Sequence, residues 1–183
     1  MIFLETTRLL FRPHEARDEN DFVRMHTDPE VRRYVGGAAW SAEKPVSRFR
    51  SEYLGKPTKT YGLWATIFKE EERYIGSCGL RAGQNSEGAH LGCYLARPYW
   101  GRGLGSEACG AFVRVAFEDL DLPRLWADVE NGNKASEGMV RKLGFRFTHK
   151  EEIPTSGRII CFYELLRSDW QKRQGSGPAR NGK

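Results

Sequence analysis

Apolar positions along the chain follow two different periods. Short runs of alternating or continuous apolar residues, bounded by polar or glycine-containing turns, are typical of β-strands. Seven segments have this character: residues 8–13, 61–68, 73–82, 89–96, 124–130, 145–150 and 158–166. Only the charged turn 69–72 separates the second from the third, so these two predict a hairpin. In segment 89–96, His90, Gly92 and Tyr94 share one face and Leu91, Cys93 and Leu95 the other.

Helical spacing of apolar residues marks the other regular segments. Residues 18–35 predict one or two helices interrupted near Pro29, and residues 41–56 predict a helix capped by Ser41. From Leu104 onward, the apolar residues at 104, 108, 111, 112 and 115 form one stripe. Segment 133–145 predicts a helix that stops at Gly144.

The order of these elements predicts an α/β (α+β) domain. Strands and helices alternate in a way that gives one mixed sheet of six to seven strands, flanked by about four helices. A chain of 183 residues fits a single domain, which we expect over residues 1–170. Residues 171–183 are polar and basic, and they are predicted to form a disordered tail.

Composition narrows the class of protein. Hydrophobic residues make up 39% and charged residues 29% of the chain, which is typical of soluble globular proteins. No apolar run approaches the ~20 residues of a membrane span, and the first residues lack the features of a secretory signal. We therefore expect a cytoplasmic protein with no membrane partner, as a monomer or a homodimer.

The four cysteines do not form a metal-binding motif in the sequence. Cys78, Cys93, Cys109 and Cys161 stand far apart, and the chain has no C-x-x-C pair. They fall in segments that are predicted to belong to the core. We expect buried thiols and no metal site.

The net charge of +5 raises the hypothesis of a nucleic-acid-binding module. Its distribution argues against one. The tail holds Lys172, Arg173, Arg180 and Lys183 and no acid, which accounts for four of the five net charges and leaves about one for the rest of the chain. The globular body therefore has no basic bias, and no nucleic-acid partner is expected.

A glycine loop between a predicted strand and a predicted helix is the first candidate binding site. Gly101, Gly103 and Gly105 alternate in "RPYWGRGLGSEA" (97–108), just before the helix that begins near Leu104. Several backbone N–H groups lack intrahelical partners there, and glycines leave them uncovered. The loop is predicted to bind an anion, with Arg102 as a further positive charge. A plain turn between strand and helix is the alternative.

Two well-known phosphate-binding motifs do not fit this loop. A nucleoside triphosphatase loop requires Gly-Lys-Ser/Thr, which occurs nowhere in the chain. A dinucleotide fingerprint requires G-x-G-x-x-G early in a run of βαβ units. Here the glycines are spaced G-x-G-x-G, and too few strands follow them.

Four motifs taken together resemble the GNAT N-acetyltransferase superfamily. They are "TTRLLFRP" (6–13), "YLARPYWGRGLGSEA" (94–108), "NKASEGMVRKLGF" (133–145) and "CFYELLRSDW" (161–170). The first and last are similar to the branch that contains the ribosomal-protein-alanine N-acetyltransferases. The resemblance covers nearly the whole chain, from Thr6 to about Trp170. It implies a mostly antiparallel GNAT-like sheet, and transfer of an acetyl group from acetyl-CoA to a primary amine.

The resemblance also implies which residues hold coenzyme A. In the family, the loop amides bind the pyrophosphate, the end of the preceding strand pairs with the pantetheine arm, and the N-x-x-S element contacts the cofactor. The corresponding residues here are Cys93, Tyr94, Leu95, Gly101, Arg102, Gly103, Leu104, Gly105, Ser106, Asn133 and Ser136. Trp100 stands where the family usually has Gln or Arg. Because most phosphate contacts are made by the backbone, we expect cofactor binding to be retained.

Two residues are candidates for the base that accepts the amine proton. His90 lies on the strand that leads to the loop, where relatives often place a carboxylate or a histidine. Asp128 stands five residues before Asn133, where some relatives have a catalytic Glu. The structural alternatives are a surface strand histidine and an exposed strand acid. Glu87 is a weaker candidate, because a loop carboxylate is usually only solvated.

The remaining catalytic roles follow from the resemblance. Many relatives protonate the leaving thiolate with a tyrosine, but Val140 occupies that position. Ser136 is the substitute, with a helix-capping serine as the alternative. The backbone N–H of Leu95 is the expected oxyanion donor. Tyr94 and Trp126 could belong to the site, but we favour the core for both.

These observations predict an acetyl-CoA-dependent N-acetyltransferase. The acceptor would be a peptide α-amine or a small amine, and transfer would be direct within a ternary complex. Loops 35–40 and 151–158 lie where the family shapes its acceptor pocket. The alternative is a non-catalytic acyl-CoA-binding sensor, suggested by the missing tyrosine.

Overall fold

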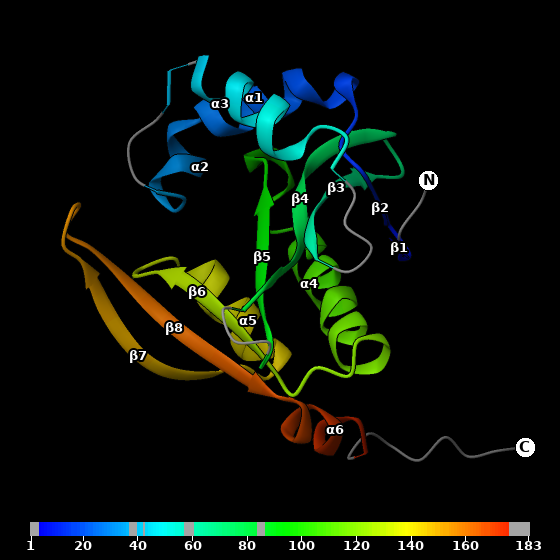
Figure 1. Cartoon of the computed structure of the whole chain (residues 1–183), viewed down its shortest axis with the longest axis vertical. Coiled ribbons are helices and arrows are strands. Elements are labelled where there is room, and N and C mark those ends of the chain that lie inside the picture. Colours follow the sequence, from blue (N-terminus) through cyan, green and yellow to red (C-terminus); the bar gives the residue numbers. More distant parts are fainter. Residues whose placement is uncertain (1–3, 37–39, 42, 57–60, 84–86, 176–183) are drawn as a thin grey trace, which may run out of the picture.

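The computed structural model describes residues 4–36, 40–41, 43–56, 61–83 and 87–175. Eight strands form one sheet in the order β1-β2-β3-β4-β5-β6-β8-β7 (Figure 1). The strands are β1 (Leu4–Glu5), β2 (Leu9–Arg12), β3 (Gly62–Phe68), β4 (Arg73–Ala82), β5 (Ala89–Leu95), β6 (Arg124–Glu130), β7 (Arg146–Ile153) and β8 (Arg158–Leu166). Every neighbouring pair is antiparallel except β5 and β6. The mixed, mostly antiparallel sheet is as predicted, and the short β1 brings its strand count to eight.

The parallel pair β5 and β6 is joined along a short length only. Its register contains two residue pairs, Ala89 with Leu125 and His90 with Trp126. Beyond His90 the two strands diverge, whereas β4 pairs with β5 along the whole of β5. The sheet therefore opens in its middle, and one edge of β5 is left without a strand partner there.

Helices cover both faces of the sheet. They are α1 (Glu19–Thr27), α2 (Pro29–Arg33), α3 (Glu43–Arg48), α4 (Leu104–Arg114), α5 (Lys134–Leu143) and α6 (Arg167–Gly175). Two separate groups of buried side chains fill the spaces beneath them. The larger group lies under α4 and α5, and the smaller one includes Phe22 of α1 and Phe49 and Tyr53, which follow α3. Figure 1 shows α1–α3 together at one end of the molecule, with α4 and α5 on the other side of the sheet.

Local sequence signals explain where several helices begin and end. The Asp28 carboxylate accepts the N–H of Glu30 at 2.9 Å, and Pro29 occupies the first turn of α2. This cap produces the predicted interruption between α1 and α2. Gly144 ends α5 with a positive φ of 103°, as expected for a glycine C-cap. The predicted stripe at residues 104, 108, 111, 112 and 115 is buried throughout, with its last residue in the π-helical turn that follows α4.

The segment predicted as one helix over 41–56 is shorter and changes character. Helix α3 covers Glu43–Arg48 and continues as a π-helical turn over Phe49–Tyr53. Ser41 precedes it, but residue 42 lies outside the described residues. Leu54 then leaves the helical conformation with a ψ of 124°.

The tail differs from its prediction in its first part. Helix α6 runs to Gly175, so residues 171–175 are helical. Trp170 packs against Phe117, with ring centroids 5.4 Å apart, and the Arg173 guanidinium donates to the carbonyl of Lys142 at 3.0 Å. Arg173 thereby satisfies one of the last carbonyls of α5. Residues 176–183 lie outside the described part.

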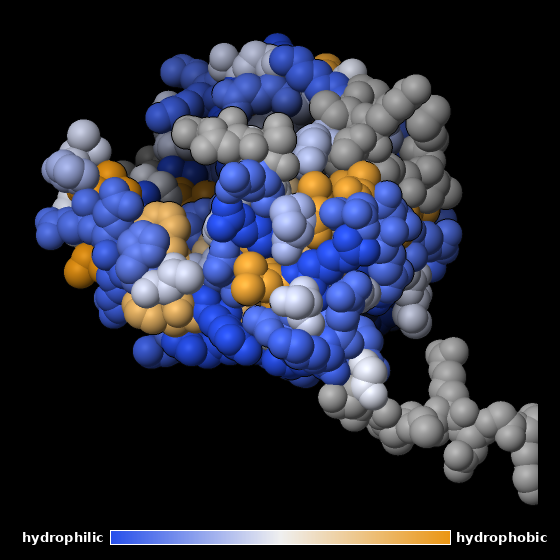
Figure 2. All heavy atoms as spheres, turned by 60° about the horizontal axis from the view of Figure 1, so that its bottom comes forward, coloured by the Kyte–Doolittle hydropathy of each residue, from blue (hydrophilic) through white to orange (hydrophobic). Residues whose placement is uncertain are grey.

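The face of the molecule shown in Figure 2 is mainly hydrophilic. Figure 2 shows polar side chains over most of the face in view, with small and separate hydrophobic patches. Among the described residues, no helix is both long and apolar enough to cross a membrane.

Candidate active site

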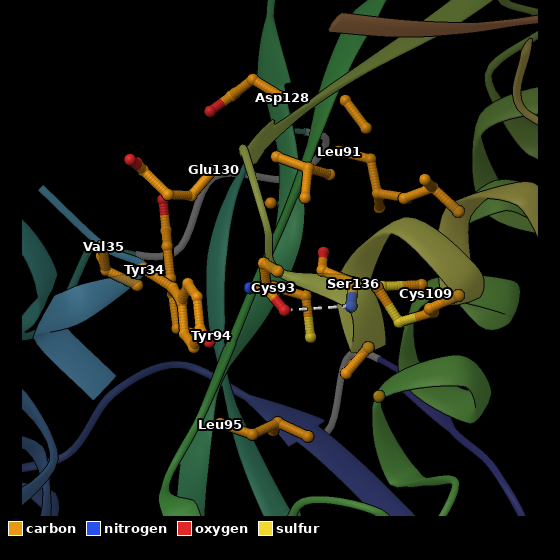
Figure 3. A pocket seen from close by; sticks show the side chains of 18 of the residues that line it. Tyr34, Val35, Leu91, Cys93, Tyr94, Leu95, Cys109, Asp128, Glu130 and Ser136 are labelled. Atoms are coloured by element: carbon orange, nitrogen blue, oxygen red, sulfur yellow. Dashed lines mark hydrogen bonds between the residues drawn. The ribbon is translucent and has the colours of Figure 1, made fainter. Parts of the chain in front are cut away.

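A cavity of about 720 Å³ opens where β5 and β6 diverge. Its wall includes β5, β6, the glycine loop with the start of α4, the start of α5 and residues at the end of α2 (Figure 3). Its size is typical of a small-molecule or cofactor site. Of the predicted cofactor residues, Cys93, Tyr94, Leu95, Gly101, Gly103, Gly105, Ser106, Asn133 and Ser136 line it.

The open edge of β5 presents unpaired backbone groups to this cavity. The N–H of Ala96 donates to the carbonyl of Ile75, the residue before Gly76 on β4, at 2.8 Å. Backbone groups of alternate residues point to opposite edges of a strand. Those of Leu91, Cys93 and Leu95 therefore point away from β4, to the side where β6 has diverged. An extended ligand could pair with this edge as an additional strand would.

Trp100 already uses one group of that edge. Its indole Nε1–H donates to the carbonyl of Leu95 at 2.7 Å. The N–H of Leu95 is not involved in this bond, so it is still free to act as a donor into the cavity. Trp100, which departs from the family pattern, thus occupies one backbone hydrogen-bond acceptor of β5.

The glycine loop has the backbone conformation that an anion site requires. Gly101 and Gly103 have φ values of 71° and 77°, in the left-handed region that favours glycine. Gly103 is the N-cap of α4, and nothing lies within 4 Å of a Cβ placed at Gly101. The first amides of α4 are thus uncovered at the positive end of the helix.

The side chains of Arg102 and Leu104 point elsewhere. The Arg102 guanidinium lies 3.8 Å from the Glu71 carboxylate and stacks 4.8 Å from the Phe68 ring centroid. Leu104 is fully buried in the core. Neither residue lines the cavity. Both residues can contact a ligand in the cavity only through their backbone. The Arg102 side chain is therefore not placed to add its positive charge to the anion site, contrary to what the sequence predicted.

The start of α5 forms the opposite wall. Asn133 is the N-cap of α5, and its Oδ1 accepts the N–H of Ser136 at 3.1 Å (Figure 3). Ser136 is therefore not the capping residue, and its side chain lines the cavity. Val140, where many relatives have tyrosine, lines the same wall and is 2% exposed.

The two candidate bases are in direct contact. The imidazole Nε2–H of His90 donates to Oδ1 of Asp128, and both residues line the cavity. This hydrogen bond lowers the pKa of Asp128, against the opposing effect of burial. It also fixes the imidazole tautomer, because Nε2 must carry the proton that is shared with a carboxylate. Among the described residues, the other nitrogen, Nδ1, has no hydrogen-bond partner.

A model of the "Acetyltransferase (GNAT) domain" family matches residues 8–146. The chain belongs to this family. It is therefore a GNAT acetyltransferase, and the family uses acetyl-CoA as its co-substrate. The predicted resemblance to the superfamily is confirmed.

Two relatives illustrate the sequence similarity of this acetyltransferase. It is 29% identical to "Uncharacterized N-acetyltransferase p20" of Bacillus licheniformis over 179 residues, covering 91% of this chain and 97% of the relative. It is 28% identical over 107 residues to YdaF of Bacillus subtilis (strain 168), a proposed ribosomal N-acetyltransferase. That match covers 54% of this chain and 58% of YdaF.

Two solved structures share the fold of the acetyltransferase. A GNAT-family acetyltransferase from Bacillus anthracis superposes with a TM-score of 0.80 at 20% identity, covering 92% of this chain and 99% of that one. RimL, a ribosomal L7/L12 α-N-protein acetyltransferase in complex with coenzyme A, gives a TM-score of 0.73 at 14% identity. That superposition covers 91% of this chain and 98% of RimL. The chain thus has sequence similarity to a proposed ribosomal N-acetyltransferase and shares its fold with RimL.

The acetyltransferase cavity also contains residues that the sequence did not single out. Glu130 lies on the same face of β6 as Asp128, and it forms an ion pair with Arg158 of β8 (Figure 3). Tyr34 approaches from the end of α2, next to Val35 of the loop that the sequence placed at the acceptor pocket. The alternation of strand β6 could have pointed to Glu130, but its pairing with Arg158 depends on the register of β8.

Other candidates of the acetyltransferase take different places. Tyr94 lines the cavity, contrary to the preference for the core, and its hydroxyl accepts from Arg81 at 3.3 Å. Trp126 is partly buried beneath the Arg124 guanidinium, 4.8 Å from its ring centroid, and does not line the cavity. Glu87 forms an ion pair with Arg124. Of the two loops expected at the acceptor pocket, Val35, Gly36, Ile153 and Arg158 reach the cavity, and residues 37–39 lie outside the described part.

Proposed function

We propose that this acetyltransferase acetylates a primary amine, either a peptide α-amine or a small amine, by direct transfer in a ternary complex. One observation carries the proposal. A single cavity connects the glycine loop, where the pyrophosphate would bind, with the His90–Asp128 pair, which can take a proton. Both substrates can therefore occupy it together, and no covalent enzyme intermediate is required.

The residues that line the cavity fit coenzyme A. The loop amides around Gly103 suit the pyrophosphate, and the open edge of β5 suits the amide-containing pantetheine arm. Bound there, acetyl-CoA would supply the activated acetyl group. The N–H of Leu95 would then act as the donor to the carbonyl oxygen, because it points into the cavity.

The proton balance favours an α-amine over a lysine side chain. At pH 7, deprotonation costs about 1.4 kcal/mol for an α-amine with a pKa near 8, but roughly 4.6 kcal/mol for a lysine amine near 10.4. A modest base therefore suffices for an α-amine. The carboxylate of Asp128 also gives this end of the cavity an acid that attracts an ammonium group, whereas the carboxylate of Glu130 is paired with Arg158.

We assign the base to the His90–Asp128 pair rather than to either residue alone. The side chain of Asp128 is 46% exposed and that of His90 is 27% exposed, so the carboxylate is the more accessible part. The hydrogen bond between them orients both groups, and the carboxylate would stabilise the imidazole after it has taken a proton. Ser136, whose side chain lines the opposite wall, is the proposed donor to the leaving thiolate.

The test is a panel of amines with the purified full chain and acetyl-CoA. It includes peptides with a free α-amine, the same peptides with a blocked α-amine and a free lysine, and small amines. Free CoA is measured by chromatography, which does not respond to the protein's own thiols. We expect turnover with at least one free α-amine or small amine, and none with its fully blocked counterpart.

Two outcomes would contradict the proposal. CoA release at the background rate for every amine, together with tight CoA binding by calorimetry, would favour the non-catalytic acyl-CoA sensor. Turnover confined to lysine side chains would refute the assignment of the acceptor class.

A nucleic-acid role for the basic tail would require nucleic-acid binding that is lost when residues 176–183 are deleted. This deletion leaves α6 intact.

A further inference from the structure

Three of the four cysteines meet at one point in the fold. The sulfur atoms of Cys78, Cys93 and Cys109 all lie within 4.8 Å of one another. They come from β4, β5 and α4, and 30 residues of the sequence lie between the first and the last. The sequence did not predict this cluster, because only the packing of α4 on the two strands brings the third thiol to the other two.

The strand register explains the closest approach. Cys78 and Cys93 are directly opposite each other in the β4–β5 ladder. The hydrogen bond from Ala96 to Ile75 places them at a non-hydrogen-bonded position, where facing side chains are closest. Cys109 completes the group from the second turn of α4, one turn after Gly105.

This spacing fits one soft metal ion. With a metal–sulfur bond of about 2.3 Å, three thiolates around one ion lie about 3.8 Å apart in tetrahedral geometry and about 4.0 Å apart in trigonal geometry. The observed limit of 4.8 Å is within a side-chain adjustment of both values. The three ligands are all sulfur, which selects soft cations over Mg²⁺ or Ca²⁺.

The cluster is also accessible from the cavity. Cys93 and Cys109 line its wall, and Figure 3 shows both beside Ser136, whereas Cys78 is fully buried. A cation can therefore enter through the cavity and meet Cys93 and Cys109 before Cys78. The side of the ion that faces the cavity would remain open to a water molecule as a fourth ligand.

We propose that Cys78, Cys93 and Cys109 form a binding site for one thiophilic cation of the Zn²⁺ and Cd²⁺ type. Three thiols lose three protons to solvent and form three metal–sulfur bonds, so the site changes from neutral to a net charge of −1. No electrons are transferred. The ion ties β4, β5 and α4 together, and it stabilises the folded state because the unfolded chain does not hold the three thiols close.

The test uses the full chain, freed of metal with a chelator, kept reduced, and titrated with Cd²⁺ alone. Ultraviolet absorption by the thiolate-to-metal charge transfer reports the binding. We expect one Cd²⁺ per chain and a rise in Tm. Cys93→Ala and Cys109→Ala should each weaken binding by on the order of 100-fold and abolish the rise in Tm.

Cys161 provides the matched control. It is also a buried free cysteine, but it lies on β8, outside the cluster, with its Sγ 3.7 Å from Oδ1 of Asn131. Cys161→Ala should bind Cd²⁺ as the unchanged protein does. Circular dichroism checks that each variant is folded, and Cys93→Ser and Cys109→Ser replace any alanine variant that is not.

Three results would overturn the proposal. One is the absence of charge-transfer absorption in the reduced protein. Another is unchanged binding after Cys93 or Cys109 is replaced in a folded variant. The third is loss of binding in Cys161→Ala alone. A disulfide between two of the three cysteines, formed in air by a protein that binds no Cd²⁺ when reduced, would show a redox pair instead.

Discussion

At the scale of single residues, the contact between His90 and Asp128 has the clearest consequence for activity. If two residues act independently in catalysis, the losses of transition-state stabilisation from removing each of them add up in the double variant. If they act as one unit, removing both costs no more than removing one. We predict that His90→Ala and Asp128→Asn each lower kcat by about 10²-fold to 10³-fold. The double variant should be no more than a few-fold worse. Steady-state kinetics from pH 6 to 9 measures all three.

The control for this prediction is Glu87→Gln. Glu87 is an exposed acid paired with Arg124, and it does not line the cavity, so its replacement should leave kcat within about twofold. Acetyl-CoA affinity, measured by calorimetry, should stay near that of the unchanged chain in every variant. Full turnover in both single variants across this pH range would show that the pair is not the base.

Individual residues also show where sequence reasoning ends. The glycines of the loop could be found because they are tied to a local conformation that the sequence encodes, and Asn133 because the resemblance to the GNAT superfamily points to it. His90 and Asp128 could be named, but not their hydrogen bond, because it depends on two pairs of residues in the β5–β6 register. The ion pair of Glu130 with Arg158 and the approach of the three cysteines to one another join different strands and helices. The sequence holds no local signal for such contacts.

At the scale of elements, the start of α4 needs a glycine for its left-handed backbone conformation and is also the proposed pyrophosphate site. Gly103 is its N-cap with a φ of 77°, and Gly55 has a φ of 63° with nothing within 4 Å of a Cβ placed there. An added Cβ costs about 1–2 kcal/mol at either position, because both are left-handed. We predict that Gly103→Ala and Gly55→Ala lower the free energy of unfolding by this similar amount in urea titrations.

Only Gly103→Ala should raise the KM for acetyl-CoA, by about tenfold or more, because only that strain disturbs the amides of the proposed pyrophosphate site. Gly55 follows the π-helical turn after α3 and does not line the cavity. An equal rise in KM for both variants, or for neither, would contradict the role of the loop.

Most of the elements themselves could be predicted. Their periodicity and caps are local properties, so the boundaries of β3, β4, β6, α4 and α5 fall within a few residues of expectation. Helix α6 was missed because its own residues are polar, and its position depends on packing of Trp170 against Phe117. The π-helical turn after α3 was missed for the same kind of reason, since Phe49 and Tyr53 are held by the core beneath α1.

At the scale of the whole molecule, two buried histidines couple stability to pH. Burial lowers the pKa of His14 to about 4 and that of His26 to about 3, and each is 3% exposed. In the unfolded chain both return to about 6.5. Between these values the unfolded state binds more protons than the folded state, so the folded state loses stability as the pH falls.

We predict that the free energy of unfolding is constant above about pH 7.5 and falls below pH 6.5, by roughly 2–3 kcal/mol for each histidine by pH 4. Urea titrations at a series of pH values measure this slope. His14→Gln should reduce the slope, because the residue that replaces this histidine does not titrate in this range. A slope that is unaffected by His14→Gln would contradict the assignment.

The opening between β5 and β6 affects how the phenotype of a destabilising substitution in this protein should be interpreted. Only two residue pairs join the part of the sheet from β1 to β5 with the part formed by β6, β8 and β7. A ligand that paired with the free edge of β5, as proposed, would complete the sheet as well as take part in the reaction. Loss of apolar packing at Leu125, which is buried and does not line the cavity, would therefore resemble a weak binding site in an assay, and a tightly binding ligand would restore stability. In such a protein, selection for ligand affinity and selection for a rigid sheet act on the same residues.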